Sequence, residues 1–237
     1  MVAKSWSQQL GDLVESQVIP RVAHRLLLHG PAGTGKSAWA QRTMGGCERL
    51  TLHQQMAPED LIGAMGLEAS KGGTKTVWQD GPAVRAMRGG RPLVLDEIDQ
   101  FSPELRCALH NVLDDWDNCR LTLPTGETVT PQAGFMVVAT TDASPEALPD
   151  PLRSRFDVVV AADAPAAGIL DSLPDGIARM LSRTYDRQHV AAWTAPVSVR
   201  SVLAMQRIGA VIGLEQAASL VFGEEATDLL AAIACQS

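Results

Sequence analysis

The sequence has few aromatic residues, and its cysteines follow no binding pattern. Aromatic residues make up 4% of the 237 residues, which argues against a surface that stacks the bases of single-stranded nucleic acid. The cysteines Cys47, Cys107, Cys119 and Cys235 are scattered and form no C-x-x-C motif, so we expect free thiols in a reducing compartment. The five histidines are also dispersed, which disfavours a metal-binding cluster built from them.

The sequence also lacks a long apolar run and an excess of positive charge. No apolar stretch approaches membrane-spanning length, and the N-terminus has no signal-peptide pattern, so we expect a cytoplasmic protein without membrane insertion. A net charge of −7 disfavours a broad footprint on a phosphate backbone, although it is compatible with a local basic patch. The hydrophobic share of 46% and charged share of 20% are ordinary for a globular protein.

A glycine-rich segment that fits G-x-x-x-x-G-K-[ST] is the most informative motif present. It follows the apolar run 26–28, which predicts a strand, and precedes 38–44, which predicts a helix, as a phosphate-binding loop requires. Glycine backbones can close around phosphate oxygens, and the helix N-terminus adds a positive dipole. The predicted nucleotide-binding residues are Gly30, Pro31, Ala32, Gly33, Thr34, Gly35, Lys36 and Ser37. In such a loop Lys36 reaches the β and γ phosphates, and Ser37 ligates Mg²⁺.

A second motif, Leu93-Val94-Leu95-Asp96-Glu97, predicts a buried parallel strand with an acidic carboxyl end. Ligands of open α/β sheets bind at these ends. Two adjacent carboxylates at a buried strand end are costly without a cation, which favours a magnesium site. We therefore expect Asp96 to hold Mg²⁺, through water, and Glu97 to orient and polarise the attacking water.

The remaining pattern predicts an α/β fold with strands and helices in alternation, and hence a parallel sheet. The expected strands lie at about 25–29, 49–53, 92–96, 135–140 and 158–161. The expected helices in this part lie at about 5–18 (ended by Pro20), 38–44, from 58 onward, 81–88 and 103–116, and two hairpins are expected at about 67–78 and 119–130. We expect a nucleotide-binding αβα core over residues 1–165.

After about residue 165 the pattern changes from alternating strands and helices to helices alone. The apolar spacing predicts helices at about 169–192, 198–212, 214–222 and 224–235. We therefore expect a small all-helical lid domain over residues 166–237, with its boundary near 163–168.

Taken together, the order of motifs resembles the AAA+ ATPases, a class of P-loop NTPases. It is most similar to the MoxR-like branch, of the NorQ/CbbQ type, within the clade that carries a hairpin in its second helix. The resemblance runs from about residue 20 to residue 222, and it implies that the hairpins are the helix-2 insert and the presensor-1 hairpin, which face the pore of a ring. The alternative, which we favour for the individual residues, is a solvated turn with Trp78 packed in the core. No N-K-x-D motif for guanine is present, so ATP is the expected nucleotide.

The resemblance also assigns roles to three polar segments. Residues 139–142 resemble the sensor-1 strand end, whose polar side chain contacts the γ phosphate or the water. Asp142 stands where the family more often has Asn, and a carboxylate is a poorer hydrogen-bond donor, so Thr141 is the alternative sensor. A strand end capped by polar residues is the structural alternative.

Two further segments supply arginines. Residues 148–157 resemble the segment that holds the arginine finger, which a neighbouring subunit offers to the transferring phosphoryl group. Arg155 matches it better than Arg153, for which pairing with Asp150 or Asp157 is the alternative. Arg200, at the start of a lid helix, resembles sensor 2, with an exposed helix-start arginine as its alternative.

The resemblance implies an ATPase that assembles as a homo-hexamer and remodels or activates a protein partner. Such motors often work with an adaptor that carries a von Willebrand factor A domain. A nucleic-acid-stimulated motor of the MCM/McrB type is an alternative, because a pore needs few lysines per subunit. A nucleotide-dependent assembly scaffold with little turnover is a second alternative, although the presence of Glu97 and of a candidate arginine finger disfavours it.

Overall fold

The computed structural model describes residues 5–16, 18–70, 73–171, 173, 177–178, 181, 198–223, 226–227 and 230. By their contacts, the residues form two compact units. The first comprises residues up to Gln9, Pro31–Lys36 and the residues from Ala162 onward, and the second comprises Leu10–Gly30 and Ser37–Ala161.

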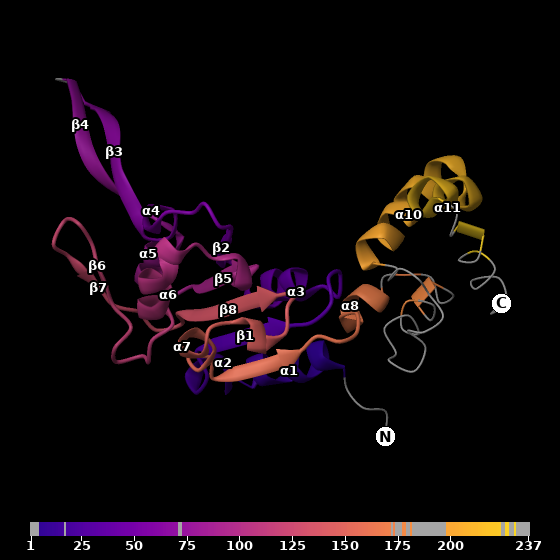
Figure 1. Ribbon diagram of the computed structural model, residues 1–237, viewed down its shortest axis with the longest axis horizontal. Coiled ribbons are helices and arrows are strands. Elements are labelled where there is room, and N and C mark those ends of the chain that lie inside the picture. The colour runs from indigo at the N-terminus through magenta and orange to yellow at the C-terminus, as the bar shows by residue number, and fades with distance from the viewer. Residues whose placement is uncertain are drawn as a thin grey trace. The chain divides into compact units, whose positions relative to one another are not determined.

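The second unit is built on a five-stranded parallel sheet (Figure 1). Its strands, in spatial order, are β2 (Glu48–Thr51), β5 (Pro92–Asp96), β8 (Met136–Thr141), β1 (Arg25–His29) and β9 (Val158–Ala161). All five strands expected from the sequence are present, and the predicted parallel α/β sheet is confirmed. The central strands are buried on both faces, which explains their nearly continuous apolar sequences.

One face of this sheet packs against three helices that form the main hydrophobic core. These are α4 (Pro58–Ile62), α5 (Pro82–Gly89) and α6 (Arg106–Val112). Alternate strand residues enter this core: Leu93 and Leu95 from β5, and Val137 and Ala139 from β8. Because β5 and β8 run parallel, the polar residues at their carboxyl ends lie at the same edge of the sheet.

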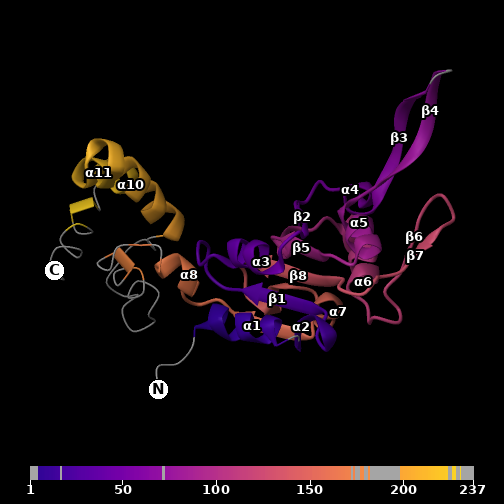
Figure 2. The ribbon, with the colours of Figure 1, turned by 180° about the vertical axis from the view of Figure 1, so that it is seen from behind.

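Two antiparallel hairpins extend from the same side of this sheet, as both ribbon views show (Figures 1 and 2). The longer pairs β3 (Gly63–Ser70) with β4 (Gly73–Asp80), and the shorter pairs β6 (Leu121–Thr122) with β7 (Thr128–Val129). Both hairpins were expected, but the longer one begins at Gly63, directly after α4, and not at about residue 67. The expected turn around Lys71 and Gly72 lies outside the described residues.

The expected N-terminal helix 5–18 is shorter than predicted. Helix α1 spans Trp6–Glu15, and a short second helix, α2 (Val18–Arg21), follows. Pro20 was expected to end the first helix, but it lies within α2. Within α2, Ile19 is extended, with a φ of −102° and a ψ of 125°, because a residue that precedes proline is disfavoured in the helical region.

The expected helix 103–116 is also shorter than predicted. It opens as a 3₁₀ turn, η2 (Pro103–Leu105), continues as α6 and ends at Val112. The side chain of Arg25 explains this end, because its Nη1 donates both to the carbonyl of Leu113, at 3.2 Å, and to the carboxylate of Asp115, at 3.0 Å. A side-chain donor therefore satisfies a carbonyl that a longer helix would have paired internally.

The first unit holds the described C-terminal helices. They are α8 (Ala167–Leu170), α10 (Val199–Ile212) and α11 (Leu214–Phe222), and α10 packs against α11. Helices were expected at 198–212 and 214–222, as found. The expected helices at 169–192 and 224–235 lie mostly outside the described residues. Within the same unit, the indole nitrogen of Trp6 donates to the carbonyl of Ala164 at 2.7 Å.

Among the helices that the structure describes, none has both the length and the apolar character needed to cross a membrane.

Candidate functional site

The glycine-rich loop joins β1 to helix α3 (Lys36–Met44), the arrangement expected from the sequence. Three of its glycines have positive φ: Gly30 at 140°, Gly33 at 84° and Gly35 at 91°. Residues with a Cβ rarely adopt these conformations, so the glycines are what allows the chain to turn tightly here. The loop therefore has the strand–loop–helix geometry of a phosphate-binding loop.

The loop closes on itself through side chains of its own. Lys36 is 5% exposed, and its Nζ donates to the carbonyl of Pro31 at 2.9 Å. The hydroxyl of Thr34, which is fully buried, donates to the same carbonyl at 3.2 Å. Lys36 thus holds its ammonium group beside the loop backbone, and Ser37 follows it in the first turn of α3, partly buried. Pro31 and Ala32 are exposed.

The loop also packs against helix α8 within the first unit. The backbone N–H of Ala166 donates to the carbonyl of Thr34 at 2.9 Å. A Cβ built on Gly35 would lie 2.4 Å from Cδ1 of Ile169. The positive φ of Gly35 therefore disfavours a larger residue there, and an added Cβ would also require the end of the Ile169 side chain to shift.

In the second unit, polar residues gather at the carboxyl edge of the sheet. Strand β5 ends at Asp96, and the neighbouring β8 ends at Thr140 and Thr141. Leu95 pairs with Ala139 in the parallel register, so Asp96 lies level with Thr140. The hydroxyl of Thr140 donates to Oδ1 of Asp96 at 2.9 Å. Asp96 is 3% exposed, so its carboxylate is almost wholly removed from solvent. The register of the two strands thus fixes one oxygen of the predicted metal-binding residue.

Glu97 has an unusual backbone conformation. Its φ of 57° and ψ of 49° are left-handed, and it is the one non-glycine residue with positive φ in the described part of the chain. Its backbone N–H donates to the hydroxyl of Thr140 at 3.4 Å, and its side chain is exposed. The turn therefore points the Glu97 side chain away from the strand while Asp96 stays buried.

The two candidate sensor residues differ in their surroundings. Thr141 is buried, and its hydroxyl donates to Oδ1 of Asp99, in the 3₁₀ turn η1 (Ile98–Gln100), at 2.5 Å. Asp142 is exposed at the exit of β8. Thr141 thus positions the turn that follows Glu97, whereas the carboxylate of Asp142 is accessible.

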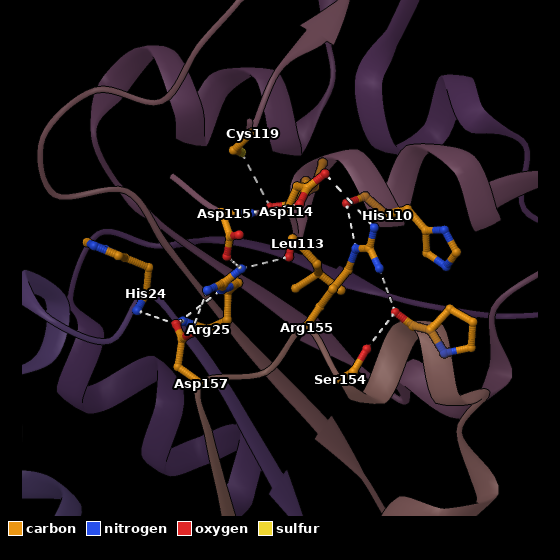
Figure 3. Close-up of polar contacts among 12 residues, drawn as sticks. His24, Arg25, His110, Leu113, Asp114, Asp115, Cys119, Ser154, Arg155 and Asp157 are labelled. Carbon is orange, nitrogen blue, oxygen red and sulfur yellow. Dashed lines mark hydrogen bonds and ion pairs between the residues drawn. The ribbon is translucent and has the colours of Figure 1, made fainter. Parts of the chain in front are cut away.

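The two candidate finger arginines also differ, and Figure 3 shows the contacts of Arg155. Arg155 is partly buried, and it donates from Nη1 to the carbonyl of Pro151 at 2.7 Å and from Nε to the carbonyl of His110 at 3.3 Å. Arg153 instead pairs with Asp150 at 2.7 Å, at the surface of helix α7 (Asp150–Arg153). The pairing expected as the alternative role of Arg153 is therefore present with Asp150, and Asp157 is not its partner.

Asp157 pairs with Arg25 (Figure 3). Its Oδ1 accepts from Arg25 Nη2 at 2.5 Å, and its Oδ2 accepts from the backbone N–H groups of His24 and Arg25 at 2.9 and 3.0 Å. Burial acts to raise the pKa of Asp157, but the hydrogen bonds from Arg25 and from the backbone outweigh it and lower that pKa. This cluster joins the starts of β1 and β9 to the end of α6.

Two titratable groups of α6 and its continuation have shifted pKa values. Burial, with the positive charges of Arg155 and Arg106, lowers the pKa of His110. Burial, with the negative charge of Asp114, raises the pKa of Cys119 to about 11. Cys119 is a free thiol, as are Cys47 and Cys107. Its raised pKa makes Cys119 a poor nucleophile near neutral pH.

Arg200, the candidate sensor 2, lies in the first turn of α10 and is exposed. Ser198 caps this helix, because its side chain accepts from the backbone N–H of Ser201 at 3.0 Å. The N-cap therefore fixes where α10 begins.

Sequence reasoning missed three residues of the acidic edge: Arg49, Asp99 and Thr140. Thr140 could have been found from strand register, because it lies level with Asp96 once β5 and β8 are aligned. Arg49, whose Nε donates to Oδ2 of Asp96, gives no such signal, because nothing in its surrounding sequence marks it as a partner of that carboxylate. The described residues contain no cluster of three or more His, Cys, Asp or Glu side chains suited to a metal ion.

Comparison with known proteins places the chain in a family. Residues 25–156 match the model of the AAA domain, dynein-related subfamily. An uncharacterized protein of Staphylococcus saprophyticus is 32% identical over 155 residues, which are 61% of this chain and 58% of that protein. Protein NorQ of Paracoccus denitrificans is 37% identical over 121 residues, which are 48% of this chain and 42% of NorQ. The chain thus spans less than two thirds of the length of these relatives.

Among solved structures, the chain is similar to NtrX from Brucella abortus. A structure of NtrX in complex with ATP gives a TM-score of 0.47 at 15% identity, and covers 99% of this chain and 68% of the NtrX chain. A second NtrX structure gives a TM-score of 0.48 at 17% identity with the same coverage.

Proposed function

The chain belongs to the dynein-related subfamily of AAA domains, and we propose that it binds ATP with Mg²⁺ and hydrolyses it. The observation that carries the proposal is the polar carboxyl edge of the sheet. There the buried Asp96 and the exposed Glu97 end β5, next to the polar end of β8, and β1 of the same sheet leads into the glycine loop.

The residues present fit Mg²⁺ and a nucleotide. Mg²⁺ in phosphate sites takes one or two protein oxygens and completes its shell with phosphate oxygens and water, so no dedicated cage is needed. The hydroxyl of Ser37 and the carboxylate of Asp96 are oxygen donors of this kind. When bound, Mg²⁺ would neutralise charge on the β and γ phosphates. The loop glycines and Lys36 would bind those phosphates.

The remaining roles follow from the positions of the side chains. Glu97, turned out of the strand by its left-handed backbone, would orient water for in-line attack on the γ phosphate. Asp142 or Thr141 would sense that phosphate. The hydroxyl of Thr141 donates to Asp99, and Asp142 is exposed at the exit of β8, so substitution of each residue in turn would tell which one contacts nucleotide or water. Arg200 would respond to the γ phosphate from the helical region.

We further propose that the chain works as a ring of six subunits, the size that the family resemblance implies, and that this ring remodels or activates a protein partner. Arg155 or Arg153 would act on the nucleotide of a neighbouring subunit. The two hairpins support a motor of this kind, since each extends beyond the sheet that carries the acidic edge (Figure 1). An adaptor with a von Willebrand factor A domain is the class of helper that the family resemblance suggests.

The experiment is steady-state ATP hydrolysis by the purified chain with Mg²⁺, alone and with DNA or RNA, while its mass in solution is followed. We expect ATP-dependent assembly and a turnover that nucleic acid leaves unchanged. Lys36→Ala is the control for contaminating activity and should hydrolyse no ATP. Strong stimulation by DNA or RNA would instead favour the nucleic-acid motor, and assembly without turnover would favour the scaffold.

A further inference from the structure

Arg49 contacts Asp96, the carboxylate to which the proposed function assigns Mg²⁺. Strand β2, which carries Arg49, runs parallel to β5, with Thr51 level with Asp96. From this neighbouring strand, Nε of Arg49 donates to Oδ2 of Asp96 at 2.5 Å. The Asp96 side chain is 4% exposed and the Arg49 side chain is 45% exposed. A buried carboxylate is thus neutralised by a cation that reaches it from the solvent side.

Both oxygens of Asp96 have donors. Oδ2 accepts from Arg49, and Oδ1 accepts from the hydroxyl of Thr140. Thr140 is buried and neutral, so it does not oppose a metal ion. Arg49 does oppose binding of a metal ion, because its positive charge lies within contact distance of the carboxylate that a divalent cation would use.

Arg49 also has a second acceptor. With its amide oxygen turned toward the guanidinium, Gln41 accepts from Nη1 of Arg49 at 2.6 Å and from Nε at 3.2 Å. Gln41 lies on α3, the helix that begins at the end of the glycine loop. Arg49 can therefore leave Asp96 and keep a hydrogen-bond partner, which lowers the cost of its release.

We propose that Arg49 is the counter-ion of Asp96 when the metal is absent, and that Mg²⁺ competes with it for that carboxylate. The proposal rests on the proposed function, because it requires Mg²⁺ and nucleotide to bind at this edge. Without Arg49, an apo chain would hold a buried, uncompensated carboxylate. With Arg49 present, the chain needs a higher Mg²⁺ concentration to form the metal site, and metal binding shifts Arg49 toward Gln41 on α3.

The test is a Mg²⁺ titration of the binding of a fluorescent ADP analogue, which needs no turnover. Arg49→Gln removes the competing charge, and we expect half-maximal Mg²⁺-dependent binding at a Mg²⁺ concentration on the order of tenfold lower. Arg49→Lys keeps the charge and should stay near the unsubstituted chain. The matched control is Arg85→Gln, because Arg85 is similarly exposed and pairs with Glu48, away from Asp96. It should leave the Mg²⁺ dependence unchanged.

A second variant keeps the proposal testable if Arg49→Gln does not fold. Gln41→Glu offers Arg49 an anionic partner on α3, and it should also lower the Mg²⁺ requirement. If a folded Arg49→Gln or Gln41→Glu chain needs the same or a higher Mg²⁺ concentration for nucleotide binding, the proposed competition is wrong. A higher Mg²⁺ requirement in Arg49→Gln would show instead that Arg49 positions Asp96. If the unsubstituted chain shows no Mg²⁺-dependent nucleotide binding, the proposed function fails, and this proposal fails with it.

Discussion

At the scale of single residues, the turn at Glu97 separates the two adjacent carboxylates of the proposed site. A left-handed backbone costs a non-glycine residue about 1–2 kcal/mol, so the surrounding structure must compensate for it. Thr140 contributes, because its hydroxyl accepts from the Glu97 N–H and donates to Asp96. One threonine thus fixes both carboxylate-bearing residues, the one that stays buried and the one that turns outward.

The two candidate finger arginines should differ in their effect on stability. Arg155→Ala removes hydrogen bonds to two backbone carbonyls, and we expect it to lower the free energy of unfolding by about 1–2 kcal/mol. Arg153→Ala removes an exposed pair with Asp150 and should cost less than about 0.5 kcal/mol. Urea unfolding of both variants measures this difference. Equal losses would show that the contacts of Arg155 do not support the fold.

At the scale of elements, the Arg25–Asp157 cluster ties two parallel strands to the end of α6 (Figure 3). Its carboxylate is ionised in the native state and has a lowered pKa. A group whose pKa is lowered by folding stabilises the fold above its ordinary pKa, and this contribution is lost as the pH falls through the lowered value. The cluster should therefore make this region sensitive to acid.

Asp157→Asn tests this sensitivity. We expect a loss of about 2 kcal/mol in the free energy of unfolding at pH 7, because hydrogen bonds to a charged group are lost. The difference from the unsubstituted chain should persist down to about pH 5 and shrink below about pH 4. Urea unfolding across this range measures it. Asp115→Asn is the control, because Asp115 contacts the same arginine but is mostly exposed. A loss at pH 7 that acid does not diminish would contradict the account.

The base of the longer hairpin depends on close backbone contact. A Cβ on Gly63, which has a φ of 118°, would lie 2.2 Å from the carbonyl oxygen of Gln79. We expect Gly63→Ala to lower the free energy of unfolding by more than about 2 kcal/mol, because strain and steric overlap add. Gly11→Ala is the control, since Gly11 has open space in α1 and helical alanine is favoured over glycine. Thermal unfolding that ranks the two variants equally would contradict this reasoning.

The sequence predicted these elements unequally, for physical reasons. The three central strands, β5, β8 and β1, were predictable because both of their faces are buried and their sequences are largely apolar. The end of α6 could not be predicted, because it depends on a contact with Arg25, which is distant in sequence. The glycine loop and Asp96 were predictable from local motifs. Arg49 and Thr140 were not singled out, because they reach Asp96 only through the pairing of separate strands.

At the scale of the whole molecule, the proposed function places each nucleotide site between two subunits. A finger that acts between subunits makes two different inactive chains complementary. Arg155→Ala keeps its own phosphate loop, and Lys36→Ala keeps its own arginine. In a mixed ring, therefore, an intact loop can meet an intact arginine.

The prediction is that Arg155→Ala loses turnover and that mixing it with Lys36→Ala partly restores ATP hydrolysis. Re-equilibrated mixtures at varied ratios should show activity that neither chain has alone. The same mixing with Arg153→Ala is the control, and it should show no such complementation if Arg155 is the finger. Mixed oligomers that form but stay inactive would argue against a role of Arg155 between subunits.

The most direct test of the central claim is to measure ATP binding and ATP hydrolysis together in Glu97→Gln. The substitution keeps the size of the side chain and removes the charge that would polarise water. We predict ATP binding close to that of the unsubstituted chain and a turnover at least about a hundredfold lower. Near-normal turnover in this variant would contradict the assignment of the β5 carboxyl edge as the hydrolytic site.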